Sequence, residues 1–131
     1  MVTCHEFENM FTFPKDPGKH LAPGESLDLN IHGGFGGPLA KKAVITDIYI
    51  ENLGGGDSLL NILEKHDPSG FKVRYTFHTV SNQVLIINFT TGLRLGEQDH
   101  DDSLQSIRIE NAHGHAHIHP RVNGFIIECE T

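Results

Sequence analysis

The chain has 131 residues, of which 37% are hydrophobic and 21% charged, and its formal net charge is −7 with histidine neutral. This length and composition predict one globular domain over residues 1–131 and exclude a disordered chain. The acidic balance argues against nucleic acid and anionic membranes as partners, because the lysines and arginines are scattered and form no basic patch.

The first residues, MVTCHEFENMF, lack the basic and apolar regions of a signal peptide, and no apolar run reaches the ~20 residues of a membrane-spanning helix. We therefore expect a cytoplasmic or virion protein. The two cysteines are Cys4 and Cys129. A disulfide between them is an option if their strands pair, but free thiols are the favoured interpretation, because two cysteines do not make a disulfide framework.

Alternation of apolar and polar residues is the dominant pattern along the chain. It predicts half-buried antiparallel strands at residues 25–32, 43–52 and 71–78. The apolar faces expected there comprise Leu27, Leu29 and Ile31; Val44, Thr46, Ile48 and Ile50; and Phe71, Val73, Tyr75 and Phe77. Residues 83–89 (QVLIINF) are apolar on both faces, which is typical of a central strand covered on both sides.

Three further segments complete the set of elements. Residues 57–68 (DSLLNILEKHDP) fit a short helix capped by Asp57 or Ser58 equally as well as a strand. Residues 103–111 and 122–129 are predicted strands, with Ile107, Ile109, Phe125 and Ile127 as their apolar positions.

Segments rich in glycine, proline, asparagine and aspartate separate the predicted strands, including residues 13–25, 52–57, 80–83 and 121–124. Eight or nine short strands in one domain predict an all-β fold, an antiparallel jelly-roll-like or Greek-key β-sandwich with at most one short helix. An immunoglobulin-like sandwich is less favoured, since the chain has no tryptophan and no spaced cysteine pair.

Residues 111–120 (NAHGHAHIHP) place four of the ten histidines at every second position: His113, His115, His117 and His119. On a strand such residues share one face at ~6.7 Å intervals. Two neighbouring imidazoles, with ligands from another strand, loop or subunit, can hold one transition metal such as zinc, nickel, copper or iron. The alternatives are adventitious metal capture and a polar strand face without any metal. The opposite face, Gly114, Ala116 and Ile118, is expected to pack against the second sheet.

The histidine run resembles three known families. A strand bearing His-x-His is similar to the first motif of the cupins, which are jelly-roll proteins; Gly124 fits that motif, but residues 120–123 include no glutamate. The letters GHAHIH resemble a strand of copper–zinc superoxide dismutases, whose spaced downstream histidines are absent here. The run is also similar to the His-x-His repeats of some phage tail-fibre tips, which implies a trimer binding iron.

Other segments give weaker signals. Residues 95–103 form an acidic loop, best interpreted as solvated, that concentrates Glu97, Asp99, His100, Asp101 and Asp102. Its carboxylates could hold calcium or supply an acid to the histidine site. Residues 32–38 (HGGFGGP) form a flexible loop with Phe35 at its tip, and they lack a phosphate-binding ending. Asn88 begins the glycosylation pattern NFT, but its apolar neighbours predict burial, so modification is not expected.

Three functional hypotheses follow. The leading one is a small non-catalytic β-sandwich that works as a binding or assembly module, forms a homo-oligomer, and takes a transition metal on the histidine row or a protein or carbohydrate ligand. The second is a cupin-like jelly-roll metalloenzyme, with an open metal position and Asp99, Asp101 or Glu97 as general base. The third is a carbohydrate-binding sandwich, although its aromatic residues are few, with Tyr49 and Tyr75 the two tyrosines.

Overall fold

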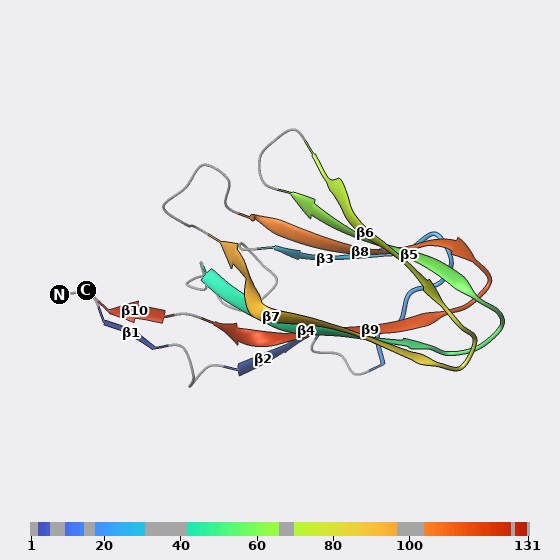
Figure 1. Ribbon diagram of the computed structural model, residues 1–131, viewed down its shortest axis with the longest axis horizontal. Coiled ribbons are helices and arrows are strands. Elements are labelled where there is room, and N and C mark those ends of the chain that lie inside the picture. The colour runs from blue at the N-terminus through green and yellow to red at the C-terminus, as the bar shows by residue number, and fades with distance from the viewer. Residues whose placement is uncertain are drawn as a thin grey trace.

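The computed structural model describes residues 3–5, 10–14, 18–30, 42–65, 70–96, 104–126 and 128–130, and all regular structure in these segments is β-strand. Two four-stranded antiparallel sheets lie face to face (Figure 1). The first contains β2 (Met10–Phe13), β9 (Ile118–Ile126), β4 (Lys42–Asn52) and β7 (Val84–Gly96), in that order. The second contains β3 (Ser26–Asn30), β8 (Ser106–Gly114), β5 (Ser58–Lys65) and β6 (Lys72–Thr79). A separate antiparallel pair joins β1 (Thr3–His5) to β10 (Glu128–Glu130).

The connectivity of the two sheets is that of a jelly roll. From β2 to β9 the chain crosses to the other sheet at every step except one, the antiparallel pair β5–β6. The sequence prediction of an antiparallel jelly-roll-like sandwich is therefore confirmed. None of the elements in the described segments is a helix long and apolar enough to span a membrane.

The core lies between the two sheets and is built mainly from isoleucine and leucine. Its fully buried side chains come from both layers: Leu21, Leu29, Ile45, Ile48, Ile50, Leu60, Ile62, Ile107, Ile109, Ile118 and Val122. Branched residues alternate along strands because successive side chains point to opposite faces of a sheet. Most of the predicted alternation reproduces this core, including Leu29, Ile107 and Ile109.

The structure decides one open prediction and corrects another. Residues 57–68, for which helix and strand were equally favoured, contain β5, because Leu60 and Ile62 both point into the core. Of residues 83–89, residues 84–89 lie in β7, which is an edge strand and not a central one. The apolar residues on its outer face, Val84 and Ile86, remain 46% and 54% exposed.

Two other expectations about exposure change on β6 and β7. On β6 the predicted inward residue Val73 is 57% exposed, and it lies at a register shift where Ile62 pairs with Tyr75 and Leu63 with Val73. On β7 both Asn88 and Thr90 are exposed. Burial therefore gives no reason to discount the glycosylation pattern at Asn88, and the sequence interpretation on that point was wrong.

Candidate ligand-binding site

An irregularity in the central strand β4 sets up a pocket on the first sheet. Ile45 pairs with Gly124 of β9, and Asp47 pairs with the preceding Asn123, so Thr46 is an extra residue with no partner on β9. Such a β-bulge bends the strand and redirects the side chains beside it. Ile45 and Ile48 consequently both face the core, while Thr46 and Asp47 lie between them in partly exposed positions.

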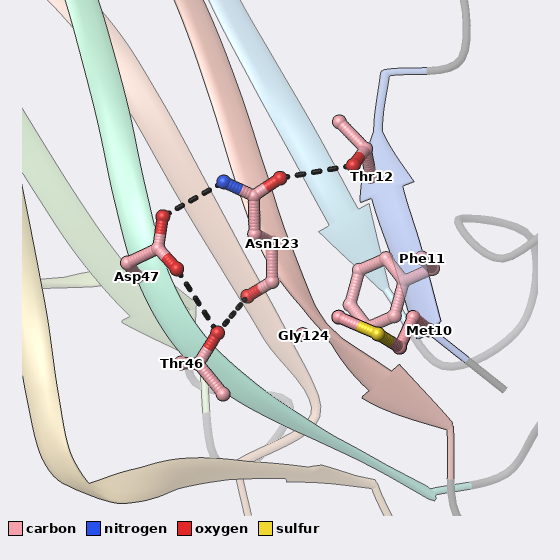
Figure 2. Close-up of a pocket in the computed structure, with 7 residues that line it drawn as sticks. All are labelled: Met10, Phe11, Thr12, Thr46, Asp47, Asn123 and Gly124. Carbon is pink, nitrogen blue, oxygen red and sulfur yellow. Dashed lines mark hydrogen bonds between the residues drawn. The ribbon is translucent and has the colours of Figure 1, made fainter. Parts of the chain in front are cut away.

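A row of hydrogen-bonded polar side chains crosses three strands at this bulge (Figure 2). Thr12 on β2 donates its hydroxyl to Asn123 Oδ1 at 2.9 Å, and Asn123 Nδ2 donates to Asp47 Oδ2 at 2.7 Å. Thr46 donates to Asp47 Oδ1 at 3.0 Å. This row holds the carboxylate between two neutral donors and gives each side chain a defined orientation.

The row forms part of the wall of an open pocket of about 370 Å³. Beside the polar side chains, the pocket is lined by Met10, Phe11 and Gly124 (Figure 2). Met10 is 83% exposed, an unusual degree for a large apolar side chain. The volume is at the lower end of the range typical of small-molecule sites, so it suits one small ligand.

Gly124 allows β9 to approach the bulge closely. A Cβ atom at this position would lie 2.1 Å from the Val44 carbonyl oxygen and 3.1 Å from the Ile45 Cα atom. Neither is the end of a flexible side chain, so any larger residue would force the strands apart. The glycine therefore sets the spacing between β9 and β4 at the base of the pocket.

The donor and acceptor groups of the pocket define its chemistry. Among the described residues that line it, Asp47 is the one charged group and none is a lysine, arginine or histidine. A carboxylate accepts hydrogen bonds only, whereas the amide of Asn123 and the two hydroxyls both donate and accept. The pocket thus offers a strong acceptor, mixed polar groups and an apolar patch formed by Met10 and Phe11.

Sequence reasoning missed this site. It assigned Val44, Thr46, Ile48 and Ile50 to one face, although the bulge makes Ile45 the core residue before Ile48. It also assigned residues 121–124 to a turn, whereas they lie within β9. The three-residue step from Ile45 to Ile48 in an otherwise two-residue alternation was the available signal.

The predicted histidine strand is divided between the two sheets. His113 lies near the end of β8, His115 and His117 lie in the connection, and His119 lies at the start of β9. The prediction that one strand carries all four was therefore wrong. The prediction of two faces holds in part. His113, His115 and His117 are exposed and Ala116 and Ile118 are fully buried, but Gly114, which was expected to pack against the second sheet, is exposed.

Contacts at Gly114 and Asn111 explain why the chain turns between β8 and β9. Gly114 has a φ of 137°, and a Cβ there would lie 2.3 Å from the Asp57 carbonyl oxygen. The buried Asn111 donates its amide to the carbonyl oxygens of Ala116 at 2.9 Å and Leu21 at 3.1 Å. These contacts satisfy backbone groups that a continuous strand would have paired with a neighbour.

The turn brings one additional histidine near the row. The rings of His20 and His117 lie 5.5 Å apart between centroids. The Nε2 atom of His119 is buried, and no described group forms a hydrogen bond with it. Within the described segments no three His, Cys, Asp or Glu side chains are grouped to hold a metal ion. Metal binding by His113, His115, His117 and His119 stays a prediction.

The candidates of the acidic loop, Glu97, Asp99, His100, Asp101 and Asp102, and the loop of residues 32–38 lie outside the described residues. In the second sheet, Arg108 forms a two-pronged pair with Asp28 and lies 4.0 Å from the centre of the Phe71 ring. The hydrogen bonds to Asp28 raise the pKa of Arg108 above its usual value. This partly exposed pair is best explained as surface packing.

No protein-family model matches the sequence, and no curated protein resembles it significantly. Among solved structures, the chain is similar to CBM32-1 from a family 31 glycoside hydrolase of Clostridium perfringens, with a TM-score of 0.49, 8% identity, and 95% and 93% of the two chains covered. It is similar to PirA, with a TM-score of 0.46, 13% identity, and 91% and 96% covered. A cowpea mosaic virus top-component chain gives a TM-score of 0.43, 10% identity, and 94% and 87% covered. These similarities are distant, and the fold is defined by the strand order of this chain itself.

Proposed function

We propose that this jelly roll is a non-catalytic binding module that takes a neutral sugar in the pocket between β2, β4 and β9. The observation that carries the proposal is the row Thr12–Asn123–Asp47, which crosses three strands beside the apolar Met10 and Phe11. A sugar ring presents hydroxyls at its edge and C–H groups on its faces. The polar row supplies partners for the hydroxyls, and the apolar side chains supply a surface for a face.

The charge of the pocket supports a neutral ligand over an anion. Asp47 is the one charged group in the described part of the pocket wall, and a carboxylate repels phosphate, sulfate and carboxylate groups. The orientation of Asp47 is fixed by Thr46 and Asn123 before any ligand arrives. A preorganised acceptor of this kind loses little conformational entropy on binding a hydroxyl.

Binding can be measured by following the backbone amide NMR signals of isotope-labelled protein during titration with neutral mono- and disaccharides. We expect shifts confined to residues 10–12, 46–47 and 123–124. Replacing Asp47→Ala should weaken binding about tenfold or more, because a hydrogen bond to a charged group contributes about 1.5–3 kcal/mol. The matched control is Glu51→Gln on the same strand, which lies outside the pocket and should bind as the wild type does.

The proposal fails if no sugar in the panel moves these amide signals, or if Asp47→Ala binds as tightly as the wild type. Shifts produced by organic ammonium ions and not by sugars would identify a site for cations. That result would retain the pocket and reject the sugar. Thermal unfolding of Asp47→Ala distinguishes a loss of binding from a loss of fold.

As a second candidate function, we propose that the histidines at the β8–β9 turn bind a transition metal. The proximity of the His20 and His117 rings favours it, because two imidazoles give a zinc, nickel, copper or iron ion part of its ligand set. Further ligands would come from His113, His115 or His119, from a second copy of the chain, or from water. Such a site is separate from the pocket, since Asn123 lies about 17 Å along β9 from Ile118.

This candidate is tested by elemental analysis of untagged protein and by calorimetric titration with Zn²⁺ and Ni²⁺. We expect His117→Ala to reduce affinity at least tenfold, since it removes one ligand of the pair. His78→Ala, which changes another exposed histidine, should not. Equal affinity in the two variants would show that the turn is not the site.

A further inference from the structure

We propose that Cys4 and Cys129 form an intramolecular disulfide that locks β1 to β10. This inference concerns the redox chemistry of the chain and is independent of the sugar and metal proposals. It starts from the register of the antiparallel pair β1–β10, in which Cys4 lies directly opposite Cys129. The flanking pairs are Thr3 with Glu130 and His5 with Glu128.

The backbone geometry of this register suits a disulfide. Directly opposed residues of an antiparallel pair have Cα atoms about 4.5–5.5 Å apart, whichever of the two alternating positions they occupy. Disulfides span Cα separations of about 4.4–6.8 Å. Opposed residues also share one face of the ladder, since successive residues alternate between faces. The fold therefore places the two cysteines of the chain in register.

The β1–β10 ladder is short, so a cross-link between its strands would stabilise it. The ladder contains three residue pairs, and Figure 1 shows β1 and β10 side by side beyond the end of the sandwich. A two-stranded ladder of this length has marginal stability in water. A covalent bond at its central pair would keep the two strands together through the fluctuations that otherwise separate them. The sequence made a disulfide conditional on the pairing of these strands, and the structure has that pairing.

The oxidation balances with a low-molecular-weight disulfide such as oxidised glutathione as the oxidant. The thiolate of one cysteine attacks a glutathione sulfur, forms a mixed disulfide and releases one glutathione thiolate. The second cysteine thiolate attacks the protein sulfur of that mixed disulfide and releases the second glutathione thiolate. Two cysteine thiols lose two protons and two electrons, and one glutathione disulfide becomes two glutathione thiols.

The experiment equilibrates the full chain with mixtures of reduced and oxidised glutathione, followed by acid quenching, alkylation and intact mass measurement. We expect one transition between a doubly alkylated form and a monomer about 2 Da lighter than the reduced chain. Peptide mapping should join the segments that contain Cys4 and Cys129. The equilibrium constant for closure should be at least about tenfold higher in the native chain than in urea, because folding brings the thiols together.

A register control uses the double variant Cys4→Ser with Thr3→Cys, which moves the thiol one residue along β1. Its new position lies opposite Glu130 and on the other face of the ladder. We expect its closure constant to fall to the value seen in urea, while its far-ultraviolet spectrum stays that of the wild type. Reductant should lower the thermal midpoint of the wild type and leave that of Cys129→Ser unchanged.

Several outcomes would overturn the proposal. These are two alkylated thiols in excess oxidised glutathione, glutathione adducts on both cysteines, disulfide-linked dimers, or equal closure constants in native and urea-unfolded chains. Equal closure in the register control would refute the claim that the pairing of β1 with β10 determines the bond. Failure of the sugar or metal experiments would leave this result unaffected, because its readout is the mass and connectivity of the cysteines.

Discussion

At the scale of single residues, the pocket depends on Gly124, which has no side chain. Thr46 is the extra residue of the bulge, and Gly124 lets the bulged strand approach β9. The polar row that includes Asp47 is thus held in place by backbone packing as well as by hydrogen bonds. A change at Gly124 should therefore affect both the stability of the protein and the shape of the pocket.

Replacing Gly124→Ala should lower the free energy of unfolding by about 3 kcal/mol, the upper end of what overpacking costs. The reason is that the new Cβ would meet the Val44 carbonyl at 2.1 Å, and a strand backbone cannot rotate away as a side chain can. The control is Gly24→Ala, where a Cβ would have open space and the φ of +89° alone should cost about 1 kcal/mol. Urea denaturation measures both values. A loss below about 0.5 kcal/mol in Gly124→Ala would contradict the close approach.

At the scale of elements, the edge strands depart most from what sequence alternation indicates. The outer-face residues of β7, Val84 and Ile86, are apolar and exposed, and Val73 of β6 is exposed as well. Because β6 and β7 end their respective sheets, neither has a strand partner on its outer side among the described segments. Such edges are where a sheet can pair with another chain, which suits the predicted homo-oligomer.

The variant Ile86→Lys should change the unfolding free energy of the monomer by less than about 1 kcal/mol, because the site is 54% exposed. By contrast, Ile48→Ala in the central strand β4 should cost about 2–5 kcal/mol, since Ile48 is fully buried. Urea titrations at low protein concentration make the comparison. A cost for Ile86→Lys as large as that for Ile48→Ala, or one that grows with protein concentration, would show that this edge is covered by a second copy.

The sequence predicted those elements whose alternation is undisturbed. The strand containing Ile107 and Ile109 and the jelly-roll class itself were predicted because burial on one face leaves a two-residue period. Residues 83–89 were misjudged, because an apolar run does not reveal whether its outer face is covered by another layer. The histidine run was misjudged because Gly114 and Asn111 end β8 through contacts with Asp57, Leu21 and Ala116, which are tertiary.

The candidate site was beyond sequence reasoning for a physical reason. Asp47 and Asn123 are ordinary polar residues in sequence, and Thr12 lies 111 positions from Asn123. A single inserted residue at Thr46 changes which side chains share a face, and its one trace in the sequence is the three-residue step from Ile45 to Ile48. The two cysteines differ from the pocket residues in this respect. Their pairing depends on the register of β1 with β10 and does not depend on a bulge.

At the scale of the whole molecule, the ten histidines decide how charge responds to acid. The net charge is −7 with histidine neutral, so protonation of all ten would carry it past zero to a positive value. Three histidines of the row, His113, His115 and His117, are exposed at one turn. An assembly or metal site that uses this turn should therefore weaken in mild acid, because protonated imidazoles repel one another and cannot ligate a metal.

We predict that the wild type is a homo-oligomer near neutral pH and that it dissociates in acid. Light scattering after size exclusion, with and without chelator, measures the change in mass. If the chelator dissociates the oligomer at neutral pH, metal holds it; if acid alone does so, charge repulsion is the cause. A monomer under all these conditions would contradict the expected assembly through the histidine turn.

The separation in sequence between Thr12 and Asn123 has a consequence for when the pocket exists at all. The walls of the pocket come from β2 and β9. A polypeptide that lacks either strand therefore has an incomplete pocket and cannot bind a ligand in it. Ligand binding is consequently coupled to the folding of the whole domain. A ligand bound in the pocket raises the unfolding midpoint of the domain in proportion to the logarithm of the ligand concentration. Thermal unfolding curves recorded with candidate compounds can therefore identify the natural ligand.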